Sequence, residues 1–152
     1  MKKPGNKSEF TGARDRELHA AFMRLLAESR LPLGELFGLA AEQPCSRSWT
    51  SAERTQVVLS RMRRGLPLGP MYKLRLEMYE HLRRVVDGLR AADPSMPEIH
   101  ACELAVLMPA PKFYITPKQA RAIITRVRKE IKKEKEERRK EERPWKKLVL
   151  KR

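Results

Sequence analysis

The sequence predicts an all-α protein, and two observations carry this prediction. First, apolar residues recur three and four positions apart in most segments between prolines, which is the spacing of a helix that buries one face. Second, no segment alternates apolar and polar residues for long enough to make a sheet. At most, residues 113–115 or 147–150 form an extended strap or a minor two-stranded pairing.

Six helices are expected, each from its own local pattern. Thr50 or Ser51 is suited to cap one helix and Thr116 to cap another, while Gly65 is suited to follow the end of a helix. The long helix that precedes Pro94 follows from a stripe of leucine, valine and methionine. The expected helices cover residues 13–29, 33–43, from the cap at 50 or 51 to 64, 71–92, 97–108 and 116 to about 142.

An internal repeat organises these helices. A shift of 65 residues aligns 32–64 with 97–129 without a gap, and six pairs are identical, where chance gives roughly two. The sequence therefore predicts two related three-helix units in tandem; the alternative is two amphipathic helices with a chance proline match. The expected boundaries are a flexible basic arm at 1–11, a first unit at 12–65, a connector at 66–70, a second unit at 71–130, and a charged helical extension with a basic tail at 131–152.

The charge points to a polyanionic partner. The chain holds 34 lysines and arginines against 19 acidic residues, a net charge of +15, and such an excess attracts nucleic acid. Its two cysteines are not in a CxxC pair, and no apolar run is long enough for a secretory signal or a transmembrane helix. We therefore expect a reduced, cytoplasmic protein with no membrane partner, or a virion-associated one if its role is structural.

Within each predicted unit, a short helix, a loop and a basic helix resemble a helix-turn-helix, although the loops at 44–49 and 109–115 are longer than the usual turn. The basic helices divide into an apolar face and a face of arginine, lysine and glutamine, as DNA-reading helices do. Trp49 and Tyr114 occupy matching loop positions, where each could stack on a base or seal a small core. The candidate nucleic-acid-binding residues are Arg47, Arg54, Arg61, Arg63, Arg64, Lys112, Lys118, Gln119, Arg121, Arg126, Arg128 and Lys129.

No pattern indicates catalysis, a cofactor or a metal site. His19, His81 and His100 are scattered over three predicted helices, and the first two are expected to be exposed. No catalytic triad, HExxH or phosphate-binding loop occurs. We therefore expect a protein that is not an enzyme.

The carboxyl-terminal segment is the most strongly charged. Residues 126–152 contain 14 basic and 6 acidic residues. Pairs such as Glu134 with Arg138 and Lys133 with Glu137 are four positions apart, so the last helix is expected to extend as a solvated rod laced with ion pairs. The rod is also a candidate for docking a protein partner.

The segment at 108–120, MPAPKFYITPKQA, and the matching WTSAER at 49–54 resemble segments of small, basic, uncharacterised proteins of Bacteroidota phages and mobile elements. The resemblance covers about 45–130. It implies a phage or mobile-element setting and no activity.

Together, these patterns predict a non-enzymatic nucleic-acid-binding protein, for DNA more than RNA, that acts as a small regulator or accessory factor. The alternative is a structural or protein-interaction component, a virion protein or an adaptor, that uses its last helix to dock a partner.

Overall fold

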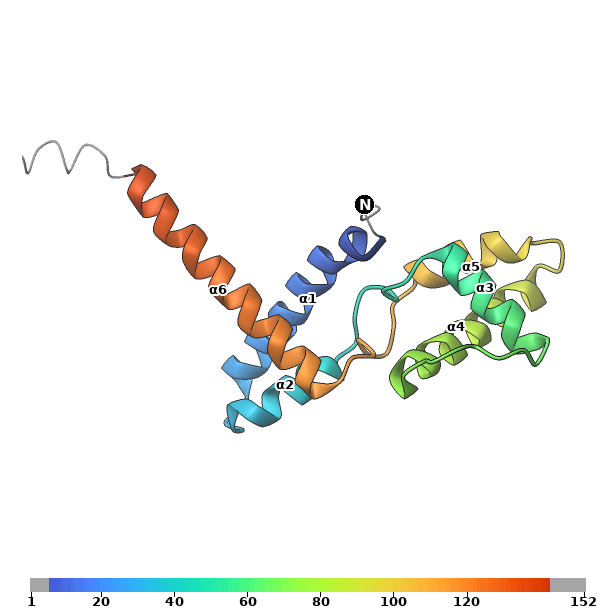
Figure 1. Ribbon diagram of the computed structural model, residues 1–152, viewed down its shortest axis with the longest axis horizontal. Helices are drawn as coiled ribbons and strands as arrows, with labels where there is room; N and C mark the ends of the chain where they lie inside the picture. Colours follow the sequence, from blue (N-terminus) through green and yellow to red (C-terminus); the bar gives the residue numbers. More distant parts are fainter. Residues whose placement is uncertain (1–5, 143–152) are drawn as a thin grey trace, which may run out of the picture.

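The computed structural model describes residues 6–142, and this part of the chain contains six helices and no strand. The all-α prediction is therefore confirmed, and each helix overlaps the segment predicted for it. The helices are α1 (Asn6–Glu28), α2 (Leu33–Ala41), α3 (Ala52–Arg63), α4 (Lys73–Ala92), α5 (Glu98–Leu107) and α6 (Pro117–Glu142) (Figure 1).

The start of α1 corrects the expected flexible arm. Helix α1 begins at Asn6, so residues 6–11 of the predicted 1–11 arm are helical. The guanidinium of Arg47 lies 4.5 Å from the centroid of the Phe10 ring. This cation–π contact ties the first turns of α1 to the loop after α2, which gives these turns a tertiary partner that the local sequence does not reveal. The remainder of the arm, residues 1–5, lies outside the described residues.

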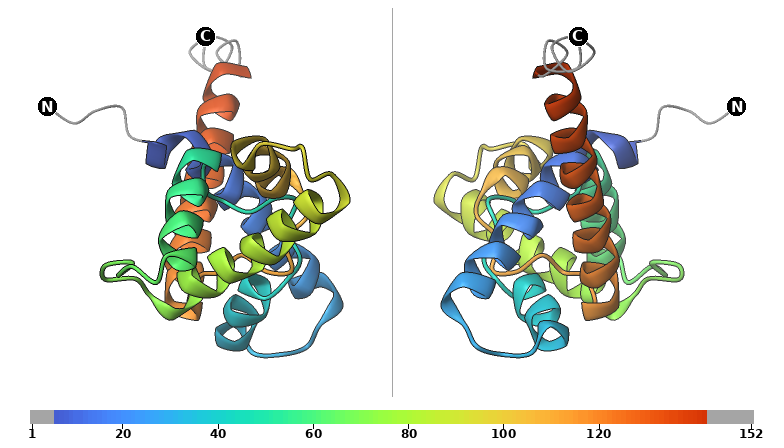
Figure 2. Two further views of the ribbon diagram at one scale, coloured as in Figure 1. Left: turned by 90° about the vertical axis from the view of Figure 1, so that its right-hand side faces the viewer. Right: turned by 90° about the vertical axis from the view of Figure 1, so that its left-hand side faces the viewer.

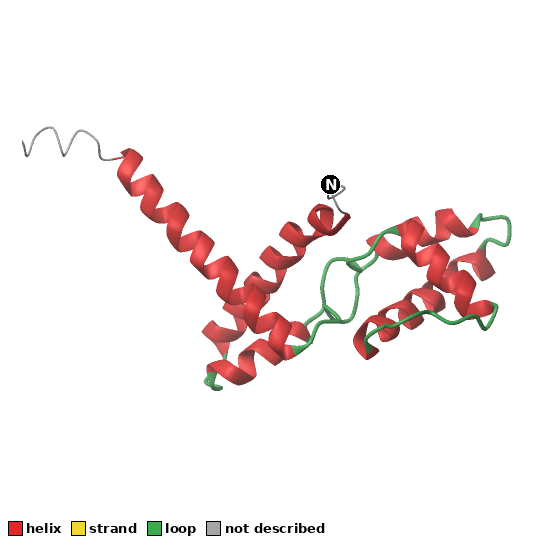
Figure 3. Cartoon of the chain, in the orientation of Figure 1, coloured by secondary structure: helices red, strands yellow, loops and turns green. Residues whose placement is uncertain are grey.

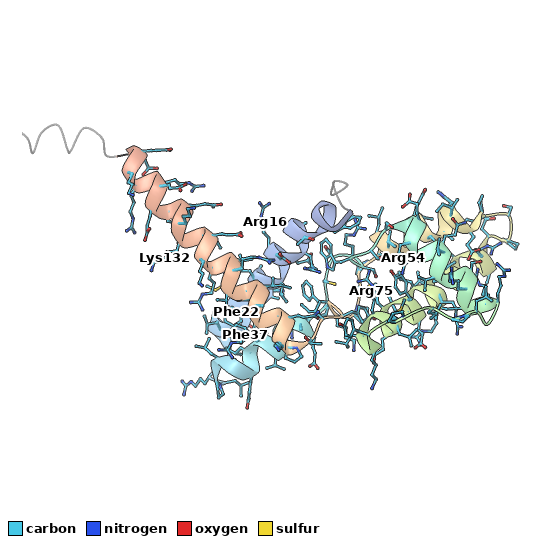
Figure 4. All side chains as sticks on the ribbon, in the orientation of Figure 1. Arg16, Phe22, Phe37, Arg54, Arg75 and Lys132 are labelled. Atoms are coloured by element: carbon cyan, nitrogen blue, oxygen red, sulfur yellow. The ribbon has the colours of Figure 1, made fainter. Side chains whose placement is uncertain are left out.

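Helices α1, α2 and α6 pack together, and we call them the outer unit because they come from the two ends of the chain. Leu18 and Phe22 of α1 meet Leu36 of α2 and Ile124 of α6, and all four side chains are fully buried. The rings of Phe22 and Phe37 stack with their centroids 5.0 Å apart (Figure 4). Burial of these apolar side chains is the main stabilisation available to a unit of three helices.

Helices α3, α4 and α5 pack together as the inner unit, which is continuous in sequence. The predicted apolar faces supply its core: Leu59 comes from α3, Leu82 and Val86 from α4, and Cys102 from α5, all fully buried. The helix that begins after Ser51 ends as expected. Gly65 has a φ of +65°, and the amides of Gly65 and Leu66 donate to the carbonyls of Met62 and Arg61, which is the Schellman pattern at a helix end.

Two segments, residues 42–51 and 108–116, connect the units, and we call them the crossovers. They run side by side between the units (Figure 3). Cys45 and Ala110 form an isolated antiparallel bridge between them, and each residue's amide donates to the other's carbonyl, at 3.0 and 2.9 Å. The bridge lies outside residues 113–115, for which the sequence allowed an extended pairing; those residues form no bridge in the structure. The second candidate for such pairing, 147–150, lies outside the described residues.

The packing differs from the tandem arrangement predicted for 12–65 and 71–130. Helix α3 leaves α1 and α2 and packs on α4 and α5, while α6 returns to α1 and α2. The crossovers explain the exchange, because an extended segment of nine or ten residues can span up to about 30 Å, and Pro44 and Pro109 favour extended backbone before them. The compact helix-turn-helix expected within each repeat is therefore not formed. Instead, the short helix α2 packs against α6, and the short helix α5 packs against α3.

Candidate nucleic-acid interface

Two adjoining hollows of about 700 and 630 Å³ form one groove between the outer and inner units. Arg14, Trp49, Arg75 and Gln119 line both hollows, so they join the two into a continuous surface. Arg54 and Arg75 lie on the side of the inner unit that faces α1 (Figure 4). The groove is also lined by Phe10, Thr11, Thr50, Ser51, Arg54, Tyr72, Lys73, Leu74, Met78, Phe113, Tyr114, Ile115, Thr116, Lys118, Ile123 and Arg126.

The groove is positive, because the described residues that line it include six cationic side chains and no acidic one. These cations are Arg14, Lys73, Arg54, Arg75, Lys118 and Arg126. Like charges on facing walls focus the electrostatic potential between them. The described lining also contains no histidine and no cysteine.

One buried carboxylate contacts two of these cations and offsets part of their positive charge. Asp15 of α1 is 5% exposed and accepts from both Arg14 and Arg126. The Arg126 contact ties α1 to α6. Asp15 therefore holds two groove arginines in place while it offsets part of their charge.

The amino-terminal ends of α3 and α6 both meet the groove. Ser51 Oγ accepts from the Arg54 amide, and Thr116 Oγ1 accepts from the Gln119 amide, with the Gln119 side chain accepting in return from the Thr116 amide. These are N-cap contacts 65 residues apart, the second a full capping box. Each helix amino terminus carries about half a positive charge, so both ends add to the positive potential of the groove.

Trp49 and Tyr114 lie at matching positions on the groove walls. Both are half-buried and pack against the outer core, and Tyr114 also contacts the inner core. The Arg47 guanidinium is 5.6 Å from the Trp49 ring, and the Lys112 ammonium is 5.3 Å from the Tyr114 ring. Tyr114 also has a φ of +57°, a conformation that costs a non-glycine residue energy. Trp49 and Tyr114 therefore cover the core, which is one of the two roles expected from the sequence. The same two rings also form part of the groove surface.

Four of the predicted site residues line the groove: Arg54, Lys118, Gln119 and Arg126. Their common feature is position, because all lie in the first three turns of α3 or α6. The apolar faces predicted for these helices anchor them: Thr55, Val58 and Leu59 are buried in the inner unit, and Ala120, Ile123, Ile124 and Val127 in the outer unit.

Four other predicted residues have structural contacts. Arg47 donates to the carbonyls of Ser48 and Thr50, Arg61 donates to the Pro67 carbonyl, Arg63 bonds Asp87 and Glu98, and Lys112 bonds Glu77 at 2.9 Å. The Lys112 hydrogen bond lowers the pKa of Glu77. These contacts hold crossovers and helices together, so we do not assign the four residues to the groove.

The remaining predicted residues lie elsewhere. Arg64 is exposed at the end of α3, and Arg121 is exposed on α6. Arg128 and Lys129 line a separate hollow of about 530 Å³ between α1 and α6. The twelve residues therefore do not form one site.

Arg14, Lys73 and Arg75 are groove residues that the sequence pattern did not reveal. The repeat covers residues 32–64 and 97–129, so both α1 and α4 lie outside it. A usable signal exists. Arg14 and Arg75 each lie four positions before a buried core residue, Leu18 or Tyr79, which places them one turn beyond the core on the same side of the helix.

His19 and His81 are half-buried rather than exposed. Burial lowers the pKa of each imidazole, assisted by Arg128 near His19 and by Arg84 near His81. Both are drawn inward because they border core positions on their helices, Leu18 and Leu82.

Cys45 and Cys102 are free and buried, and burial raises the pKa of each thiol to about 11. The described residues contain no group of three potential metal-ligating side chains. Within the same residues, no helix has the length and apolar character needed to cross a membrane.

Comparison of the chain with protein-family models, with characterised proteins and with solved structures finds no match.

Proposed function

We propose that this protein is a non-enzymatic nucleic-acid-binding protein that holds the phosphate backbone in the groove between its two units. The observation that carries the proposal is the lining of the groove, in which the residues that the structure describes supply six cationic side chains and no acidic one. Contacts to phosphate supply most of the affinity of proteins for DNA. Among the described lining residues there is no histidine, cysteine or carboxylate, which favours binding over catalysis.

Duplex DNA is the ligand that the groove's construction favours. The capped amino termini of α3 and α6 reach the groove from different units. Their capping contacts are equivalent and lie 65 residues apart in the sequence. The two strands of a duplex are related by local twofold axes, and paired protein elements commonly match that symmetry. A small regulator or accessory factor, in a phage or mobile element, fits this binding role.

The structural alternative rests on α6, which continues beyond both units (Figure 2). After Val127, its only apolar residue up to Glu142 is Ile131. A helix that docks a protein normally presents apolar residues at repeated three- and four-residue spacings. This part of α6 lacks that pattern, so we favour nucleic acid over a protein partner.

Binding of a fluorescently labelled duplex, measured by anisotropy across a salt series, tests the proposal. The groove variant is Arg54→Gln with Arg75→Gln. The matched control is Arg30→Gln with Arg83→Gln, which removes the same charge from exposed positions outside the groove. Because each phosphate contact contributes about 0.9 to the salt slope, we expect the groove variant to lower the slope by about 1.8.

The control should retain nearly the wild-type affinity and slope. Equal losses in both variants would assign binding to net charge and overturn the groove. The salt series would run from about 50 to about 300 mM, because counterion release acts strongly in this range. A wild-type affinity that does not change across the series would overturn phosphate binding itself.

A further inference from the structure

Helix α6 carries a second cationic surface that is separate from the groove. Arg121, Arg128, Lys132, Lys135 and Arg139 follow one another at steps of seven, four, three and four residues, and all are exposed. We call them the basic stripe. At 3.6 residues per turn and 1.5 Å per residue, the stripe stays on one side of the helix for about 27 Å.

The stripe borders a hollow whose described lining residues include no acidic side chain. This hollow, about 530 Å³ between α1 and α6, is lined by three stripe residues together with Lys129, His19, Met23, Thr125 and Ile131. Burial and the charge of Arg128 lower the pKa of His19 there. The hollow is therefore a second positive region, even with His19 neutral.

No ion pair within 4.0 Å holds a residue of the basic stripe in the described part of the chain. The ion pairs expected along the rod, such as Glu134 with Arg138 and Lys133 with Glu137, are not formed within 4.0 Å in the described residues, and no stripe residue has an acidic partner there. The side chains remain solvated because surface pairs gain little over hydration. Four of the six glutamates of α6, at positions 130, 134, 137 and 141, lie along another side of the helix, whereas Glu136 and Glu142 lie beside the stripe.

The groove and the basic stripe lie on opposite sides of α6. Gln119, Ile123 and Arg126 face the groove. At 100° per residue, the mean direction of these three is about 180° from that of the stripe. Past the groove, its side of the helix continues into Glu130 and Glu134, which line a different hollow together with Asp15. A polyanion in the groove is thus repelled from continuing along that side.

We infer that the basic stripe is a second phosphate-backbone surface, so that one protein molecule holds two duplex segments, one in the groove and one along α6. The inference rests on the proposed function of the groove. Because the groove side of α6 faces the inner unit, this helix cannot lie inside the major groove of a duplex held there, so occupation of both surfaces bridges two segments. The regular row of exposed cations fits the regular charge of a duplex, about one phosphate per 1.7 Å of axis.

A bridging assay tests the inference. Bead-bound duplex is mixed with the full chain and a second, labelled duplex, and the retained label is measured. The stripe variant carries Lys132→Gln, Lys135→Gln and Arg139→Gln, at exposed positions beyond the core. The control carries Arg24→Gln, Arg30→Gln and Arg83→Gln, which removes the same charge from exposed positions elsewhere.

We expect the stripe variant to lose at least tenfold in retained label while it still binds a single duplex through the groove. The control should bridge like the wild type. Bridging by the stripe variant at the wild-type level would overturn the inference and would assign bridging to a dimer with two grooves. Wild-type protein that binds one duplex without bridging would overturn it as well.

Failure of the proposed function gives a different result, because wild-type protein would then bind no duplex, or the groove variant would bind a single duplex as the wild type does. A further outcome concerns polyglutamate as a probe. If the wild type binds polyglutamate and the stripe variant does not, while the stripe variant still bridges duplexes, the stripe would be reassigned to an acidic protein and the inference would be overturned.

Discussion

Cys45 and Ala110 exchange both of their backbone hydrogen bonds, and they are exactly 65 residues apart, the same separation that aligns the two sequence repeats. The flanking bonds obey the same relation. The Ser48 amide donates to the Val106 carbonyl, and the Phe113 amide donates to the Ala41 carbonyl, both at 3.0 Å. A shift of 65 converts each of these contacts into the other. The crossovers thus have a local twofold relationship centred on Cys45 and Ala110.

The Cys45 thiol lies at this centre. Its Sγ lies 3.1 Å from the Arg47 carbonyl and 3.3 Å from the Lys112 carbonyl, and these carbonyls are again 65 residues apart. The same thiol therefore serves two equivalent acceptors, one on each crossover. Its burial raises the thiol pKa to about 11, so we expect it to stay protonated at neutral pH.

The bridge predicts a stabilising crosslink. In a hydrogen-bonded antiparallel pair the Cα atoms are about 5.5 Å apart, within the range of a disulfide. Ala110→Cys should therefore form a disulfide with Cys45 on mild oxidation and raise the free energy of unfolding by about 4 kcal/mol, the value for closing a loop of this length. Mass spectrometry and urea unfolding check this. Persistent free thiols at both positions would contradict the pairing of the crossovers.

The Asp15 carboxylate predicts opposite effects on stability and binding. Asp15→Asn removes the charged acceptor of Arg14 and Arg126, so the free energy of unfolding should fall by about 1–2 kcal/mol. The same change removes a negative charge behind the groove, so duplex affinity should rise. Urea unfolding and anisotropy measure the two quantities. A variant that loses both stability and affinity would show that Asp15 acts on the groove only by holding its shape.

A buried hydroxyl pair links the inner unit to the first crossover. Thr50 Oγ1 and Tyr79 Oη share a hydrogen bond of 2.9 Å, and both residues are buried. Tyr79→Phe leaves the threonine hydroxyl without this partner and should lower the free energy of unfolding by about 1–2 kcal/mol. Tyr72→Phe is the control, because Tyr72 is 83% exposed. Equal denaturation midpoints for the two variants would contradict the role of this bond.

The two half-buried histidines predict acid sensitivity. The pKa of His19 and of His81 is lower in the folded protein than in the unfolded chain. The unfolded chain therefore binds more protons as the pH falls below about 6.5, and stability decreases. We expect a lower free energy of unfolding at pH 5.5 than at pH 7.5, with a smaller difference in the His19→Gln, His81→Gln variant. An unchanged difference in that variant would assign the effect to other groups.

Much of the local structure could be predicted from the sequence because its causes are local. The buried faces of α3 and α6 follow from helical spacing, and Ser51, Thr116 and Gly65 mark helix boundaries through their own hydrogen bonds and dihedral angles. The groove could be predicted only in part. Arg54 and Lys118 were found because they lie on the repeated helices, whereas Arg14 and Arg75 come from helices that the repeat alignment did not cover.

The sequence by itself determined the helices, their apolar faces and the excess of positive charge, because helix periodicity, capping and composition act within one or two turns of chain. The tertiary structure alone decided which helices share a core. The apolar face of α3 does not by itself specify its partner helices, and the extended crossovers around Pro44 and Pro109 let it pack on α4 and α5 while α6 packs on α1 and α2. That exchange assembles the groove from residues distant in sequence. Its physical causes are the packing of the two cores and the length that the extended crossovers can span.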